Sequence, residues 1–392
     1  MRRRLFRGLG WGALAVLSLS MACVDKVGGD TGVAPLYVYD GTTNSVLVWN
    51  DINDLYKAGH DGTTVPGPNR TIDLNTAAPS LALAWGGMAM DDSTQRLYLA
   101  SADGSKILRI LHAGTKSGDL TTSPGEDRIS FSVDMAAGSF SGGALGQVAV
   151  NSSGDLLITQ WSSTQSQIWK ISDQAQTANP NGKFTGASYL VNNAASGDSN
   201  CTGVAVVGTQ SIYAFFGNGN NITVGNDDFT GPRLRYGTFS GGFLANTNVI
   251  INKSTDTSKA TKLLAYGCLA YDTSNSRLYT ATSATDFPIL VHTSGKFSSQ
   301  SPVDVVPSNQ LAGPTNGALR IIAHAGQKDW MVGAESTDGA TQGTGTNKLW
   351  IWRAPSQTAD TANPSPVYVT LPDASSTSGT VKILGLALDG SQ

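Results

Sequence analysis

Charged residues are scarce in this sequence of 392 residues: only 14% are Asp, Glu, Lys or Arg, and the formal net charge is −3. A chain with so little positive charge has no electrostatic footprint for nucleic acid, so no nucleic-acid partner is expected. Glycine is frequent by contrast, with 45 residues. Low charge combined with many turn-forming residues is typical of an extracytoplasmic all-β protein and not of a helical cytosolic enzyme.

Cysteine and histidine are also rare, with three and four residues. No His-x-x-x-His or His-Glu pair occurs, so the sequence does not predict a zinc site. The Gly-x-Ser-x-Gly pattern is absent as well, which argues against a hydrolase with a nucleophile elbow. These absences leave no recognisable catalytic motif.

A short apolar run lies at residues 9–19, too short for a comfortable membrane span. It is preceded by positive residues, Arg2, Arg3, Arg4 and Arg7. The run ends in Met21-Ala22-Cys23, which resembles a bacterial lipoprotein signal, in which the cysteine is lipidated. We expect a lipoprotein-type signal peptide at residues 1–22, lipidation at Cys23 and a tether at residues 23–33. Cleavage after Ala22 as an ordinary secretory signal is the alternative.

A strand pattern repeats along the rest of the chain. Its first strand holds a small residue, and the aligned alanines at 89, 149, 205 and 270 recur about every 60 residues. Three more short strands follow in each copy, with β-branched or aromatic residues alternating with polar ones. The fourth strand of the fifth copy is expected at residues 303–306. A period that holds four strands indicates the blades of a propeller.

The two ends of the chain complete one another in this pattern. Residues 36–39, 46–49 and 71–74 look like second, third and fourth strands, and residues 384–389 supply the missing first strand. The sequence therefore predicts an all-β, six-bladed β-propeller of four-stranded blades over residues 34–392. A C-terminal inner strand joining the N-terminal blade would remove the exposed sheet edges.

An Asp-x-x-x-x-Arg-Leu-Tyr signature occurs twice, at residues 91–98 and 272–279. It resembles the bacterial surface propellers of the YVTN and NHL-like group, and the resemblance covers about residues 34–392. What it implies is a propeller fold on a secreted protein. Members share no single activity, so the resemblance transfers no catalytic residue.

A column of polar residues follows the first strands: Asp91, Asn151, Asp272 and Asp389. We expect them to cap the hairpin turns that follow, since Asp and Asn side chains commonly bond the backbone two residues on. A ring of carboxylates for a cation is the alternative.

Cys201 and Cys268 precede the aligned alanines by even numbers of residues, four and two. Equal parity would place both side chains on the same side of neighbouring inner strands, which makes them a candidate disulfide in an oxidising compartment. The stagger between them would strain such a bond.

The loop at residues 217–231 is rich in Asn, Gly and Asp. Asp227 and Asp228 are candidate Ca²⁺ ligands, although the loop lacks the regular spacing of an EF-hand or of a Gly-Asp nonapeptide array, and a plain surface loop is the simpler interpretation. No other cofactor is expected.

By propeller convention, the loops that enter the inner strands share one face with the loops that join second to third strands. Aromatic residues among amides would suit contact with a protein or a glycan there. The candidate binding face comprises Trp85, Trp161, Asp198, Asn200, Tyr266, Phe287 and Asn316. Alternatively, Trp85 and Tyr266 plug the mouth of the channel.

The function these features favour is binding or scaffolding, without catalysis, by a lipid-anchored protein of the bacterial envelope, in the periplasm or at the cell surface. Its partner would be a protein or a glycan, and it would contact the membrane through the lipid at Cys23. One alternative is a metal-dependent enzyme of the lactonase or lyase kind, against which the small axis-facing residues and Gln147 argue. Another is a structural module of a surface assembly.

Overall fold

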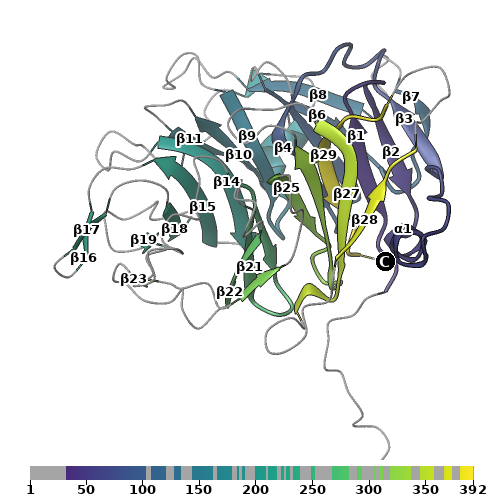
Figure 1. Cartoon of the computed structure of the whole chain (residues 1–392). Coiled ribbons are helices and arrows are strands. Elements are labelled where there is room, and N and C mark those ends of the chain that lie inside the picture. Colours follow the sequence, from purple (N-terminus) through teal and green to yellow (C-terminus); the bar gives the residue numbers. More distant parts are fainter. Residues whose placement is uncertain are drawn as a thin grey trace, which may run out of the picture.

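The structure is a computed structural model (Figure 1). It describes residues 32–102, 107–120, 128–133, 144–161, 166–178, 183–184, 188–189, 199–208, 211–218, 222–224, 227–229, 233–238, 249–251, 267–281, 289–293, 303–304, 309–311, 318–336, 345–356, 366–372 and 380–391. These residues form six sheets of four or five strands and one two-stranded ribbon. The predicted all-β propeller is confirmed. We number the six sheets 1 to 6 in ring order.

Sheet 1 joins the two ends of the chain. Its innermost strand β29 pairs antiparallel with β1, so that Leu36 lies opposite Leu388 and Val38 opposite Leu386 (Figure 1). The predicted pairing of the C-terminal strand with the N-terminal sheet is therefore confirmed. From the axis outward, sheet 1 consists of β29 (Ile383–Leu388), β1 (Leu36–Asp40), β2 (Ser45–Trp49), β3 (Arg70–Asp73) and β7 (Gly118–Asp119).

The next two sheets follow in chain order, each with its first strand innermost. Sheet 2 consists of β4 (Leu83–Asp91), β5 (Arg96–Ser101), β6 (Ile107–Ile110), β8 (Arg128–Val133) and β12 (Lys183–Phe184). Sheet 3 consists of β9 (Ala144–Val150), β10 (Leu156–Trp161), β11 (Ser166–Ile171) and β13 (Ser188–Tyr189).

The remaining three sheets have the same order, and a ribbon of β16 (Ile222–Val224) and β17 (Asp227–Phe229) extends from sheet 4. Sheet 4 consists of β14 (Ser199–Val207), β15 (Ser211–Asn218), β18 (Arg233–Thr238), β19 (Val249–Ile251) and β23 (Val303–Asp304). Sheet 5 consists of β20 (Leu269–Asp272), β21 (Arg277–Ala281), β22 (Ile289–Thr293) and β24 (Asn309–Leu311). Sheet 6 consists of β25 (Ala318–His324), β26 (Trp330–Ser336), β27 (Gly345–Arg353) and β28 (Val367–Thr370).

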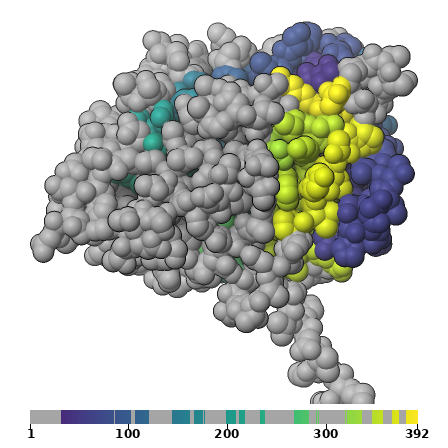
Figure 2. Space-filling model, in the orientation of Figure 1, coloured from purple at the N-terminus to yellow at the C-terminus, as the bar shows by residue number. Residues whose placement is uncertain are grey.

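The sheets stand around an axis as a closed ring. The inner strands contact one another in the order β29, β4, β9, β14, β20 and β25, and β25 contacts β29. One cluster of buried apolar side chains lies between each neighbouring pair of sheets. The cluster between sheets 6 and 1 combines side chains from both ends of the chain, and Figure 2 shows the C-terminal residues beside the N-terminal ones.

The inner strands approach one another closely around the axis. A Cβ added at Gly203 on β14 would lie 2.6 Å from the Gly267 carbonyl oxygen next to β20, and one added at Gly385 on β29 would lie 2.5 Å from the Leu83 side chain on β4. Glycine is required at such positions because the neighbouring strand occupies the space of a side chain.

Short parallel strands cover the outer edges of three sheets. Each of these strands comes from a connection within the next sheet of the ring. The chain of sheet 2 supplies β7, which pairs with β3 of sheet 1, and the chain of sheet 3 supplies β12, which pairs with β8 of sheet 2. The chain of sheet 5 supplies β23, which pairs with β19 of sheet 4. The expectation that residues 303–306 form the outer strand of sheet 5 is therefore wrong: residues 303–304 cover sheet 4, and β24 forms the edge of sheet 5. Covered edges prevent pairing with other chains.

Helix α1 (Ile52–Asp61) lies in the connection between β2 and β3 and was not predicted. Asp51 caps its first turn by accepting from the Asn53 N–H, and Gly62 ends it in the left-handed conformation at φ 66°. Its buried face packs on the outer strand β28 of sheet 6. A second short helix, α2 (Asp173–Ala178), follows β11.

Within the described part of the chain, we find no helix with the length and apolar character needed to cross a membrane.

We predict that crowding at the axis makes Gly203→Ala destabilising. The added Cβ collides with backbone, which cannot rotate away, so the free energy of unfolding should fall by about 1–3 kcal/mol in urea denaturation. Gly67→Ala is the control, because a Cβ there meets no atom within 4 Å, and it should stay within about 0.5 kcal/mol of the wild type. Equal stabilities of the two variants would contradict the close approach of β14 and β20.

Candidate functional site

A cavity of about 530 Å³ lies on the axis between the inner strands. We call it the funnel. Its narrow end contains the buried residues Gly86, Met88 and Gln147, and its wall consists mainly of Val, Ile, Leu, Ala and Met side chains. The wide end opens where the inner strands turn into the second strands. Exposed residues there are Ser93, Ser152, Thr273, Gln327 and Ser391.

Gln147 closes the narrow end of the funnel. It extends from β9 to two other inner strands: its Oε1 accepts from the Val204 N–H (3.0 Å) and the Leu269 N–H (2.9 Å), and its Nε2 donates to the Leu269 carbonyl oxygen (2.6 Å). Gly86 lets the side chain pass, because a Cβ there would lie 3.2 Å from Gln147 Cγ. One buried amide therefore holds sheets 3, 4 and 5 together at the axis.

The rim of the funnel is built from the turns that follow the inner strands. Asp91 accepts from the Ser93 N–H, Asn151 accepts from the Ser153 N–H, and Asp389 accepts from the Ser391 N–H. Asp272 accepts from the Asn275 N–H in the same way. The prediction that this column caps turns is confirmed.

Asp92 is the rim residue with an unusual environment. The pKa of its carboxyl is raised to about 7, chiefly by burial. The neighbouring carboxylates of Asp389 and Asp91 also raise this pKa, whereas a hydrogen bond from the Gly390 N–H lowers it. The carboxyl therefore binds its proton at a higher pH than an ordinary aspartate, so the charge of the rim depends on pH.

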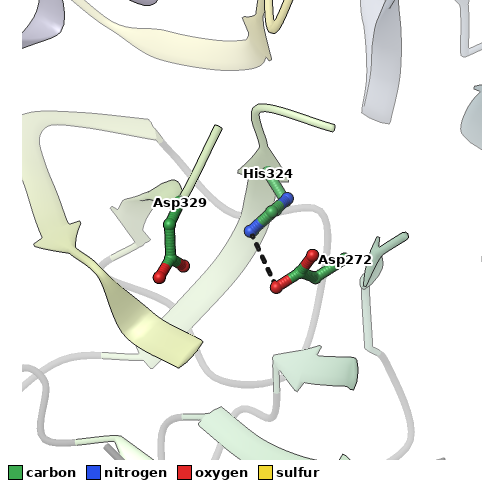
Figure 3. Close-up of side chains that lie close together, drawn as sticks. All are labelled: Asp272, His324 and Asp329. Atoms are coloured by element: carbon green, nitrogen blue, oxygen red, sulfur yellow. Dashed lines mark ion pairs between the residues drawn. The ribbon is translucent and has the colours of Figure 1, made fainter. Parts of the chain in front are cut away.

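A second group of polar side chains lies between sheets 5 and 6. His324, at the end of β25, has a side chain only 2% exposed, and its Nε2 lies 3.7 Å from Asp272 Oδ2. Asp329 lies on the other side, and Figure 3 shows the two carboxylates flanking the same end of the imidazole ring. Burial lowers the pKa of His324, against the attraction of both carboxylates. We call these three residues the junction cluster.

No sequence pattern indicates the junction cluster. Its residues come from the end of β20, the end of β25 and the turn before β26, so no short motif contains them. Asp272 belongs to the capping column, and both of its oxygens bond Asn275: Oδ1 accepts from the backbone N–H and Oδ2 from the side-chain amide. Oδ2 also faces His324, a contact that the capping pattern does not predict.

Of the predicted binding face, the structure describes the side chains of Trp161 and Asn200. Both lie at the end of their strands opposite the rim, and Asn200 adopts φ 56° with a buried Oδ1 that has no hydrogen-bond partner among the described residues. Asp198, Tyr266, Phe287, Asn316 and the Trp85 side chain lie outside the described residues. The funnel was not predicted, and it opens at the opposite end.

The candidate disulfide is not formed: no bond joins Cys201 and Cys268. Cys201 packs between sheets 3 and 4, whereas Cys268 packs between sheets 5 and 6. The reason is a register shift in β14 between Cys201 and Gly203, where an extra residue reverses the alternation of faces. Ala205 consequently faces sheet 5 while Cys201 faces sheet 3, so the parity argument fails.

Asp227 and Asp228 lie on β17 of the two-stranded ribbon, but their side chains are outside the described set. Residues 1–22, Cys23 and the tether up to residue 31 are outside it as well. The signal peptide, the lipidation site and the Ca²⁺ site therefore stay predictions.

One solved structure supports the fold by its similarity. A chain in a crystal structure of a nidogen/laminin complex superposes with a TM-score of 0.51 at 13% identity, over 92% of this chain and 100% of that one. The β-propeller domain of Myceliophteria thermophila Cps50 (Swd1) is similar with a TM-score of 0.42 at 11% identity, over 80% of this chain and 78% of that one. No family model and no curated protein matches the sequence. The protein is a β-propeller.

We predict that Gln147→Leu lowers the free energy of unfolding by about 2–4 kcal/mol, because it leaves buried backbone groups of Val204 and Leu269 without partners. Chemical denaturation measures the loss. Gln327→Leu, on the exposed rim, serves as the control and should change stability by less than about 0.5 kcal/mol. A Gln147→Leu variant as stable as this control would show that the amide does not join the three strands.

We predict that Asp92→Asn changes the pH dependence of stability. The pKa of the Asp92 carboxyl rises from its usual value of 3.8 to about 7 on folding, so between these two pH values the folded state binds more protons than the unfolded state. Asp92 therefore makes the free energy of unfolding fall as the pH rises from 3.8 to about 7. Asparagine can still accept from the Gly390 N–H. The variant should therefore be more stable than the wild type at pH 8, by about 1 kcal/mol after allowance for partial exposure.

Thermal unfolding followed at several pH values checks this prediction. Asp61→Asn, which changes an exposed carboxylate on α1, is the control. Parallel pH profiles for the wild type and Asp92→Asn would rule out a raised pKa.

Proposed function

We propose that this protein is an exported binding module: a six-bladed propeller, one blade for each of sheets 1 to 6, that holds a protein partner at the mouth of the funnel. A lipid on Cys23 would anchor it in the bacterial envelope, after removal of residues 1–22, at the periplasmic or outer surface. The sequence pattern of the first 23 residues supports export and anchoring.

The observation that carries the proposal is the funnel itself. Its volume of about 530 Å³ lies in the usual range of roughly 300–1,000 Å³ for binding pockets and is enough for one or two inserted side chains. The wall is apolar, with half-buried Met90, Val150 and Val206, and the rim carries the carboxyl group of Asp92, with the buried carboxylate of Asp389 next to it. A partner segment with an apolar side chain next to a basic one would match both parts.

A protein suits this site better than a glycan. Glycans bind on exposed aromatic rings, and Tyr271 is the one tyrosine, tryptophan or phenylalanine among the described residues that line the funnel. One structural neighbour is a chain of a nidogen/laminin complex, which is an assembly of proteins. The rigid ring would present the rim without rearrangement, which lowers the entropic cost of binding.

A metal-dependent enzyme of the lactonase or lyase kind is the second candidate. The junction cluster favours it, because His324 also lines the funnel. Gln147, which occupies the axis in place of carboxylates, argues against a reaction centre at the bottom of the funnel.

Site-specific photo-crosslinking in intact cells tests the binding proposal. A photoreactive phenylalanine analogue replaces Gln327 on the rim or, as the matched control, the exposed Tyr368 on the outer strand β28. We expect a protease-sensitive adduct from position 327. The additional substitution Val206→Arg, which fills the funnel, should reduce it at least about tenfold, a loss of about 1.4 kcal/mol in binding.

Circular dichroism confirms that Val206→Arg is folded. Adducts of equal yield from positions 327 and 368, or adducts that persist with Arg at 206, would contradict binding at the funnel. An adduct that resists protease and is removed by glycosidase would identify a glycan partner and overturn the choice of a protein.

A further inference from the structure

The junction cluster joins three potential metal ligands from two neighbouring sheets. One ligand atom each of Asp272, His324 and Asp329 lies within 4.8 Å of the others. Asp272 belongs to sheet 5, while His324 and Asp329 belong to sheet 6 and its first turn. Figure 3 shows Asp272 facing the Nε2 end of the imidazole ring and Asp329 on the other side of that end.

The imidazole of His324 has no hydrogen-bond partner in the part of the chain that the structure describes. Its side chain is 2% exposed, and neither Nδ1 nor Nε2 is hydrogen-bonded to any described residue. The ring of Tyr279 stacks on His324 at 5.6 Å, and its buried hydroxyl group likewise lacks a hydrogen-bond partner among the described residues. Buried polar atoms normally have partners, because each one left alone costs about 1–3 kcal/mol.

The junction between sheets 2 and 3 provides a comparison within the same chain. Arg96-Leu97-Tyr98 occupies the place there that Arg277-Leu278-Tyr279 occupies in sheet 5. The hydroxyl group of Tyr98 donates to Gln176 Oε1 on α2 (2.8 Å), and Arg96 pairs with Asp173. Between sheets 2 and 3, other protein groups thus provide partners for the tyrosine hydroxyl and the arginine side chain. Between sheets 5 and 6, the Tyr279 hydroxyl and Arg277 Nη1 have no hydrogen-bond partner among the described residues.

We propose that the junction cluster binds one divalent transition-metal cation of the zinc type, through a ring nitrogen of His324 and one carboxylate oxygen each of Asp272 and Asp329. Two carboxylates balance the charge of such an ion, although the nearby Arg277 opposes it in part. The imidazole selects against Ca²⁺ and Mg²⁺, which prefer oxygen ligands, and in favour of Zn²⁺ and its neighbours.

The surroundings of the carboxylates suit this role. Asp329 accepts from the N–H and the hydroxyl group of Ser356, and Asp272 accepts from the N–H and the side-chain amide of Asn275. Such partners orient metal ligands. The separation of up to 4.8 Å exceeds the roughly 3.3 Å between ligands around zinc with bonds of about 2.0 Å, so the most distant ligand atoms approach each other by up to about 1.5 Å when the ion binds. His324 lines the funnel, which provides the path of entry.

The ion would join sheet 5 to sheet 6, close to the clasp of the ring, and stabilise the folded chain in proportion to its concentration. This inference does not depend on the proposed partner binding, because it concerns the junction between sheets 5 and 6 and has its own readouts.

Equilibrium dialysis of the purified full-length chain against Zn²⁺, after removal of metal by a chelator, tests the proposal. We expect one zinc per chain and a melting temperature that rises with zinc concentration. Asp329→Asn and His324→Asn should each weaken zinc binding at least about 100-fold, and Co²⁺ should give visible absorption that these variants lose. His60→Asn, in the exposed pair of His60 with Asp61, is the matched control and should bind like the wild type.

The proposal would be overturned if the wild type did not bind zinc, or if both variants bound zinc as tightly as the wild type. A crystal of the wild type soaked in Zn²⁺ keeps the test valid even if the variants do not fold. Anomalous scattering should show the ion between Asp272, His324 and Asp329. A peak confined to His60 or to the cysteines would contradict the proposed site.

Discussion

The structure depends on the pairing of β29 with β1. This pairing places the last strand of the chain on the axis beside the first, and it completes a sheet that would otherwise lack its inner strand. The apolar cluster between sheets 6 and 1, and helix α1 on the outer strand of sheet 6, add two further contacts between the ends. Because each sheet packs only on its neighbours, a ring without this closure would leave two apolar faces in water.

Closure also creates the funnel. Six inner strands around one axis leave little room, so glycines occur where backbones meet, and Gln147 fills the centre while satisfying the backbone groups of Val204 and Leu269. Gln147 joins three inner strands at that level, and the funnel opens toward the rim, where Asp92 lies next to Asp389. A hydrogen bond that stabilises the axis thus determines which end of the ring can receive a ligand.

Repetition made the architecture predictable from the sequence. The column of alanines, the capping residues and the complementary ends of the chain are local patterns, and each survives in the structure. Predictions failed where one irregular residue or a distant contact decides the outcome. The bulge in β14 reversed the orientation of Cys201, and β23 pairs with a sheet other than its own. The junction cluster could not be predicted, because no sequence motif contains its residues. His324 lies next to Asp272 only because sheets 5 and 6 pack against each other.

The most direct test of the account is amide hydrogen exchange, read by mass spectrometry, of the two segments that form the clasp. If β29 completes sheet 1, the peptide covering residues 383–388 exchanges as slowly as the peptide covering residues 36–40, and both exchange together with the inner strands in one cooperative unit. Rapid exchange of residues 383–388 in a chain whose other inner strands stay protected would contradict the closed ring.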